Sequence, residues 1–125
     1  MVKLIVAVVT VGLIALHPTS AGAHHRPNSG CSRSGDVCQS TAKVDGIRKL
    51  RVALVGKYFQ RYKLCVIPPE GSKTCKTFRI KKQGSFYGDT VRWSTNFPNE
   101  GRGAYTVVWK MTSGGRFGKK LGFHV

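Results

Sequence analysis

Acidic residues are scarce in this chain. The sequence of 125 residues has five Asp and Glu against 21 Lys and Arg, which gives a formal net charge of +16 at pH 7. A surface with this balance repels itself, and its long-range field attracts polyanions. All the acids fall in predicted turns, at strand ends or in the N-terminal part, and they are Asp36, Asp45, Glu70, Asp89 and Glu100. They therefore do little to neutralise the predicted strand faces.

Catalytic motifs are also missing. The sequence has no glycine-rich phosphate loop, no Gly-x-Ser-x-Gly nucleophile elbow and no His-Glu-x-x-His zinc motif. His124 is the one histidine in the part expected to fold, and glycoside hydrolysis requires two carboxyl groups that face one cleft. We therefore expect a protein that is not an enzyme and that uses no cofactor.

Long apolar segments are limited to the N-terminus. Lys3 precedes an uncharged, mostly apolar run over 4–16, and the small residues Ala21-Gly22-Ala23 follow. This order is typical of a secretory signal peptide, and the run is shorter than the ~20 residues that a membrane-spanning helix needs. We expect residues 1–23 to be removed and the remaining chain to be secreted.

Helical periodicity is absent after residue 40, where glycines punctuate short alternating segments. Residues 24–36 are poor in apolar side chains and rich in Gly, Ser and Pro, which predicts a flexible arm. Residues 37–125 are expected to form one all-β domain, an antiparallel sandwich of six or seven strands, and we treat the chain as a monomer. The clearest strands are predicted at 47–55, 58–67, 73–82, 90–95, 105–111 and 117–125.

Four cysteines lie in the expected mature chain, and an exported protein usually oxidises such cysteines. No Cys-x2-Cys pair is present, so two disulfides are favoured over a zinc site. A bond between Cys65 and Cys75 joins two predicted strands as a hairpin whose paired residue numbers sum to 140. The hydrophobic alternation agrees with an even sum, because a slip by one residue would mix the two faces. Cys31 is then expected to pair with Cys38.

The same register brings cations together on one side of the hairpin. Arg61 lies directly opposite Arg79 in this register, and like charges opposed across a ladder destabilise it by up to ~1 kcal/mol. An ordinary solvated face mixes both signs of charge. We therefore predict an anion-binding face formed by Arg61, Lys63, Arg79 and Lys81, and extended by Arg48, Lys49 and Arg51 if the preceding strand is its neighbour.

Parity predicts the last turn. The final two predicted strands have odd-numbered residues facing inward, so their paired numbers must sum to an even value. A two-residue Gly114-Gly115 loop gives an odd sum. We therefore expect a three-residue loop, Ser113-Gly114-Gly115, or a bulge, with one glycine in the left-handed region.

The C-terminal part carries a recognisable pattern, Gly103-Ala-Tyr-Thr-Val-Val-Trp109 followed by Ser113-Gly-Gly and Gly122-Phe-His-Val125. Residues 103–125 resemble the closing strands of immunoglobulin-like secreted bacterial domains. Their Gly-x-Tyr-x-Val-x-Trp rhythm is similar to that of the periplasmic copper-resistance C family. The resemblance implies an immunoglobulin-like β-sandwich.

The copper site that this resemblance implies has no counterpart in the matching segment. The copper-resistance C family commonly places a copper-binding histidine in the turn between the two closing strands, where this sequence has Ser113-Gly-Gly-Arg116. Copper binding would instead depend on His24 and His25, at the expected new N-terminus. We expect no tight metal site.

The charge and the expected compartment together favour one functional class. We expect a secreted, cationic module that binds an anionic polymer or surface, such as a wall polymer, an acidic polysaccharide or lipid headgroups. Nucleic acid matches less well, because an exported protein rarely meets it and no nucleic-acid-binding motif is present. The alternatives are a structural immunoglobulin-like module without a ligand, and a copper-binding periplasmic or extracellular protein.

Overall fold

A computed structural model describes residues 26–125 as ten short strands and one helical turn. The expected signal peptide, 1–23, lies outside the described residues, as do His24 and His25. The elements are β1 (Ser29–Cys31), β2 (Val37–Ser40), β3 (Lys43–Val44), β4 (Ile47–Leu54), β5 (Arg61–Ile67), β6 (Thr74–Arg79), β7 (Lys81–Gln83), β8 (Phe86–Arg92), α1 (Trp93–Asn96), β9 (Ala104–Met111) and β10 (Leu121–His124). In this part of the chain, no helix has the length and apolar character needed to cross a bilayer.

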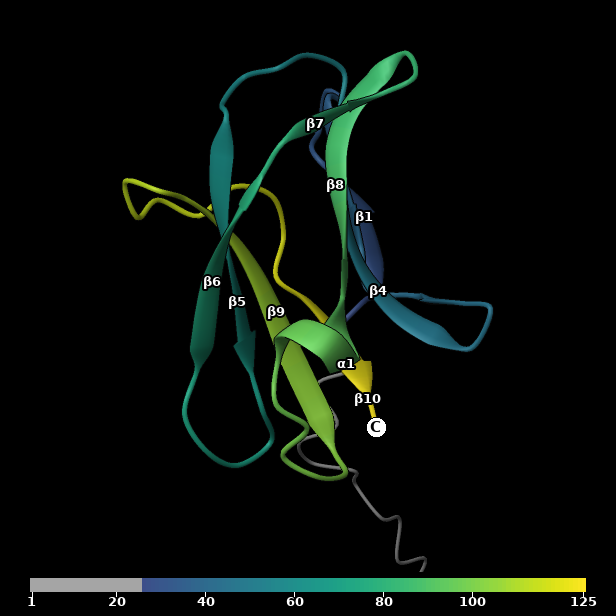
Figure 1. The fold of residues 1–125 in the computed structure, drawn as a ribbon, viewed down its shortest axis with the longest axis vertical. Helices are drawn as coiled ribbons and strands as arrows, with labels where there is room; N and C mark the ends of the chain where they lie inside the picture. The colour runs from purple at the N-terminus through teal and green to yellow at the C-terminus, as the bar shows by residue number, and fades with distance from the viewer. Residues whose placement is uncertain (1–25) are drawn as a thin grey trace, which may run out of the picture.

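The strands form two antiparallel sheets packed face to face (Figure 1). One sheet has the order β1-β2-β4-β8-β7, with β3 added to β4, and the other has the order β10-β9-β5-β6. The order β2-β4-β8-β7 corresponds to strands A, B, E and D of an immunoglobulin sandwich, and the order β10-β9-β5 corresponds to strands G, F and C. β6 is then an additional edge strand next to β5. The prediction of an all-β sandwich with two disulfides is confirmed.

The core follows from the two-residue period of the strands. Alternate side chains of β4, β5 and β9 point between the sheets and are almost completely buried. Full burial of one such apolar side chain stabilises the fold by about 1.5–3 kcal/mol. The largest fully buried side chains are Trp109, Tyr62, Tyr105, Leu50, Leu54 and Leu64.

The predicted hairpin register is confirmed. In the β5–β6 ladder, Arg61 is paired with Arg79 and Cys65 with Cys75, and the two cysteines form a disulfide. The other disulfide joins Cys31 to Cys38, which are paired in the β1–β2 ladder. Two disulfides in a chain of this size are consistent with an oxidising environment outside the cytoplasm.

The N-terminal segment differs from the prediction of a flexible arm over 24–36. Residues 29–31 form β1 and pair with β2. The Cys31–Cys38 bond closes the turn between β1 and β2, and the amide of Gly122 donates a hydrogen bond of 3.0 Å to the carbonyl of Pro27. The disulfide and backbone hydrogen bonds therefore order a segment that contributes little to the core.

The predicted strand at 73–82 is divided in the structure. β6 ends at Arg79, Ile80 is buried, and the chain then crosses to the other sheet, where β7 pairs with β8 (Figure 1). The amide of Ile80 donates to the carbonyl of Gln60 at 2.9 Å, which satisfies the backbone at the crossing. Burial of Ile80 between the layers explains the break, since a straight continuation would keep this segment at the edge of one sheet.

The last hairpin confirms that the numbers of paired residues add up to an even value. Leu121 pairs with Val107, and the ladder continues with the same sum through β10. The three-residue loop lies one residue earlier than predicted, at 112–114, because the amide of Met111 donates to the carbonyl of Gly115. Gly114 has a φ of 110°, so the expected glycine with positive φ is present.

Tyr105 fastens the start of β9 to the loop that precedes it. Its hydroxyl donates to the carbonyl of Gly101 at 2.8 Å and accepts from the amide of Glu100 at 2.9 Å. A tyrosine at this position, bonded to backbone a few residues upstream, is the tyrosine corner of immunoglobulin-like sandwiches. The motif therefore supports the same fold as the strand order.

Replacing Tyr105 with Phe is expected to lower the free energy of unfolding by about 0.5–1.5 kcal/mol, because a partly buried carbonyl and amide lose their partner. Chemical denaturation followed by intrinsic fluorescence measures the change. Tyr58→Phe is the matched control, since Tyr58 is 55% exposed, and it should have almost no effect. Equal stabilities of the Tyr105 and Tyr58 variants would refute the role of the corner.

Candidate anion-binding site

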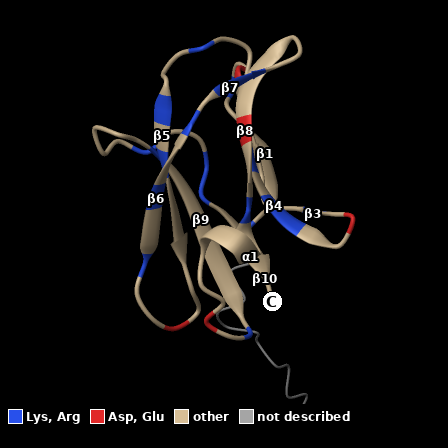
Figure 2. Cartoon of the chain, in the orientation of Figure 1, with Lys and Arg blue, Asp and Glu red and all other residues tan. Residues whose placement is uncertain are grey.

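The outer face of the β10-β9-β5-β6 sheet carries the largest set of predicted site residues. Arg61 and Lys63 alternate on β5 with buried side chains, so they point to solvent. Arg61 lies opposite Arg79 on β6, and Lys63 lies opposite Lys110 on β9. We call the side chains of Arg61, Lys63, Arg79 and Lys110 the β5 face. Figure 2 shows cations on β5 and β6 of this layer, with acids confined mainly to turns and to β8.

The two opposed arginines border a hollow at one end of this face. Arg61 and Arg79 line a depression of about 110 Å³ together with Lys57, Gln60 and Ile80. No carboxylate lines it. Each guanidinium can bind a phosphate, sulfate or carboxylate through two parallel hydrogen bonds. Two guanidinium groups and one ammonium group therefore surround a space of the size of a small anion.

A second hollow lies beside Lys110, on the same outer surface. It has a volume of about 430 Å³, and four of its lining residues are cations that the sequence analysis did not select. These cations are Lys73, Lys110, Arg116 and Lys120. The two-residue alternation of β9 identifies Lys110 as an outward residue, because the inward residues of this strand are odd-numbered. Lys73 and Lys120 lie outside the strands, and Arg116 forms only an isolated bridge with Lys110, so no sequence period marks them.

Lys110 is repelled by the neighbouring cations. The nearby charge of Lys73 lowers the pKa of Lys110 below its ordinary value of 10.5, and burial and the charges of Lys63 and Lys120 add to this effect. A lowered lysine pKa means that the positive form is disfavoured where it stands. An anion bound among these side chains would remove that penalty.

The ion pairs of the described residues leave this face uncompensated. Among the lysines and arginines in 26–125, Lys81 alone lies within 4.0 Å of a carboxylate oxygen, and its partner is Asp89 at 3.6 Å. No strand of the β10-β9-β5-β6 sheet contains an acidic residue. Any counter-charge for the β5 face must therefore come from solution or from a ligand.

The prediction that Lys81 lies beside Arg61 and Arg79 is wrong. Lys81 is on β7, in the other sheet, because the chain crosses between the layers at Ile80. Its ammonium group pairs with Asp89, a buried carboxylate that also accepts a hydrogen bond of 3.0 Å from the hydroxyl of Tyr62. Burial, and next the charge of Asp89, raise the pKa of Tyr62 far above its ordinary range. Lys81 therefore stabilises a buried acid between the sheets.

The proposed extension through β4 is also wrong. β4 pairs with β2, β3 and β8 and does not neighbour β5 or β6. Arg48 donates to the carbonyls of Thr41 at 2.9 Å and His124 at 3.3 Å, and its guanidinium lies 4.8 Å from the ring centre of Phe123. Burial lowers the pKa of Arg48. Arg48 is thus a packing residue, whereas Lys49 and Arg51 point outward from the opposite sheet.

Metal ligands do not cluster in the described part of the chain. Within 26–125, no group of three or more His, Cys, Asp or Glu side chains is arranged to hold an ion. The histidines proposed for copper, His24 and His25, lie outside these residues.

Comparison with known proteins finds no matching family model, no matching curated protein and no matching solved structure. The resemblance of residues 103–125 to the copper-resistance C family therefore stays a resemblance of short motifs.

Lys73→Gln is expected to raise the pKa of Lys110 toward its ordinary value, because the main source of repulsion is removed. The unfolded chain lacks this repulsion and binds more protons, so the free energy of unfolding of the parent protein should rise with pH in the range just below 10.5. NMR titration of the lysine side chains measures the pKa. Lys43→Gln, on β3 of the other sheet, is the control, and an unchanged pKa in the Lys73 variant would contradict the cluster.

Proposed function

We propose that this protein is a secreted, non-enzymatic module that binds an anionic polymer through the β5 face. One observation carries the proposal: two like-charged pairs, Arg61 with Arg79 and Lys63 with Lys110, are opposed across neighbouring strands of a sheet that has no acidic residue. Such pairs cost stability in the free protein. An anion between the partners turns the repulsion into attraction.

The arrangement of the cations favours an extended ligand. Neighbouring strands lie ~4.8 Å apart, and outward side chains on one strand are ~6.6 Å apart. Lys63, Lys110 and Arg116 occupy consecutive positions across the strands, because Lys110 is paired with both of the others. A chain of repeated negative groups lying across the strands would contact several of these cations at once. A single small anion would leave most of them unpaired.

The apolar surface argues against a lipid bilayer. The exposed large hydrophobic side chains of the described residues are Val55, Tyr58, Phe86 and Val125, and none of them is on a strand of the β10-β9-β5-β6 sheet. Surface insertion into a bilayer requires an apolar face beside the charges. Sequence-tolerant binding of single-stranded nucleic acid likewise uses exposed aromatic platforms. The β5 face offers charge and hydrogen bonds, which match an acidic polysaccharide or another anionic wall polymer.

The expected compartment agrees with such a ligand. The N-terminal pattern predicts export, and the two disulfides are consistent with an oxidising surrounding. Sulfated, carboxylated and phosphorylated polymers are common outside cells. Binding would be strongly electrostatic, and it should weaken steeply with salt as condensed counterions are released.

Replacing both Arg61 and Arg79 with Gln is expected to weaken binding to heparin, a sulfated and carboxylated polysaccharide, by about tenfold or more at low salt. The slope of log affinity against log salt concentration should decrease by about 2, one for each lost contact. Calorimetry at several salt concentrations gives both numbers. The free energy of unfolding should stay equal or rise, because repulsion between β5 and β6 is relieved.

The matched control is Arg33→Gln with Arg102→Gln, which removes the same charge from exposed loop positions. Equal losses of affinity in the two double variants would show that net charge alone matters and would refute the site. Long-chain polyphosphate, vesicles with anionic lipid and single-stranded DNA are tested in parallel. Binding to vesicles or DNA that is tighter than to both polymers, and that depends on Arg61 and Arg79, would assign the face to that other class of ligand.

A further inference from the structure

The opposite sheet also presents cations to solvent. Lys49 and Arg51 alternate on β4 with the buried Leu50 and Val52, so their side chains point away from the core. Lys49 lies opposite Arg92 on β8, which is another like-charged pair across a ladder. We call Lys49, Arg51 and Arg92 the β4 face. Among residues 26–125, no carboxylate oxygen lies within 4.0 Å of these three cations.

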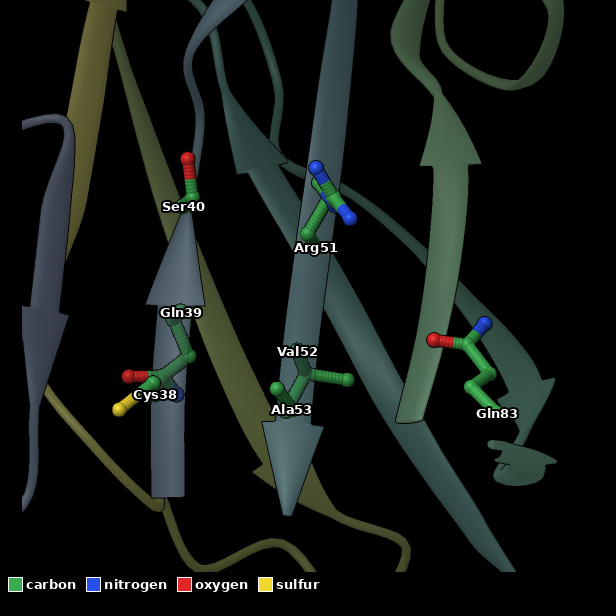
Figure 3. Close-up of a pocket in the computed structure, with 7 residues that line it drawn as sticks. All are labelled: Cys38, Gln39, Ser40, Arg51, Val52, Ala53 and Gln83. Carbon is green, nitrogen blue, oxygen red and sulfur yellow. The ribbon is translucent and has the colours of Figure 1, made fainter. Parts of the chain in front are cut away.

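A hollow of about 210 Å³ lies on this side of the molecule, next to Arg51. Figure 3 shows its lining side chains, which come from β2, β4 and β7. Arg51 supplies the guanidinium, Ser40 a hydroxyl and Gln83 an amide, while Ala53 and the sulfur of Cys38 contribute apolar surface. Gln83 reaches the site because the chain crosses between the sheets at Ile80.

The composition of this hollow differs from that of the β5 face. A binding site for a small organic group combines apolar surface with a few placed polar groups. A sugar ring has the complementary character, because its C–H groups form apolar patches and its hydroxyls lie around the rim. The Arg51 guanidinium can then bind a carboxylate or sulfate on the same ring. On β4 the hollow is lined by Ala53, a small residue whose ladder partner is Gly88.

Gly88 has a structural reason to be glycine. A Cβ atom on Gly88 would collide with the backbone carbonyl oxygen of Val52, so no side chain can stand there without moving the β4–β8 ladder. Glycine at this position therefore allows β8 to approach β4 closely beside Ala53, and the larger side chains of Arg51 and Gln83 also line the hollow.

We infer that the β4 face holds a second ligand site, for one acidic sugar unit of a polysaccharide, on the side of the sandwich opposite the β5 face. The inference takes its class of ligand from the proposed function. The outward side chains of two packed sheets point in opposite directions, with the sheets ~10 Å apart. A single extended chain cannot contact both faces without wrapping around the domain. The protein therefore binds two polymer segments and bridges them, which adds avidity without any new contact.

Three double variants with the same loss of charge test the inference. Arg51→Gln with Arg92→Gln removes the β4 face, Arg61→Gln with Arg79→Gln removes the β5 face, and Arg33→Gln with Arg102→Gln is the charge control. Calorimetry with a heparin hexasaccharide should give two bound ligands for the parent and the control, and one for each face variant. Light scattering with long-chain heparin should show cross-linked complexes for the parent and the control, reduced at least fivefold in each face variant.

A charge-neutral variant separates the hollow from the cations. Ala53→Leu fills the floor on the solvent side of β4, where the side chain is exposed, so the fold should be retained. It should remove the same hexasaccharide site as the Arg51 and Arg92 replacements. Ala104→Leu, at an exposed position on β9, is its control. Ala53→Leu should leave the affinity for polyphosphate, which has no sugar ring, unchanged.

The outcomes distinguish the two proposals. One bound hexasaccharide in the parent, or cross-linking by the β4-face variant equal to that of the control, would overturn the second site and leave the β5 face standing. Two bound hexasaccharides in the β5-face variant, with one in the β4-face variant, would overturn the proposed role of the β5 face and keep the second site. Equal effects of all three double variants would overturn both.

Discussion

The pairing of β5 with β6 in a single register is the constraint on which the rest of the molecule depends. A slip by one residue would turn Tyr62 and Leu64 outward and bury Arg61 and Lys63. The Cys65–Cys75 bond joins directly paired residues and excludes that slip. It also holds the two strands together where Arg61 and Arg79 repel each other. The same alignment thus produces both the core and the charged surface. The disulfide keeps the strands paired, so the charged surface can exist while the core stays intact.

This alignment could be predicted from the sequence because two independent signals, cysteine spacing and apolar alternation, act on the same pair of strands. The crossing at Ile80 could not. Phe78 and Ile80 alternate with the polar residues Thr77, Arg79 and Lys81, so nothing local marks the point where the chain leaves one layer for the other. What stabilises the crossing is contributed from distant positions, by Asp89 beside Lys81 and by the carbonyl of Gln60. Residues 29–31, in contrast, are ordered by near neighbours, since β1 pairs with β2 and Cys31 is bonded to Cys38.

The candidate site shows the same limit. Arg61, Lys63 and Arg79 share one face because the hairpin register could be predicted. The extension through Arg48, Lys49 and Arg51 depended on strand order, which long-range packing decides, and its condition is not met. Arg48 illustrates how a cation can be absorbed by the fold, since its charge is held by two carbonyls and an aromatic ring. Within residues 26–125, the cations of the β5 face and the β4 face have no such carbonyl or ring contact. Their separation onto two opposite surfaces is a property of the sandwich that no single strand reveals.

One continuous segment, 74–83, supplies one of the two edge strands of each sheet, as β6 in one and β7 in the other. Open edges offer unpaired backbone groups to any neighbouring chain, and lysine on an edge discourages such pairing. This segment carries Lys76, Arg79, Lys81 and Lys82, all of them exposed. The charge therefore disfavours pairing between copies of the protein along these two edges. Conditions that neutralise it, such as high salt or a dense coat of polyanion, weaken this protection, so the colloidal behaviour of the protein depends on its ionic surroundings.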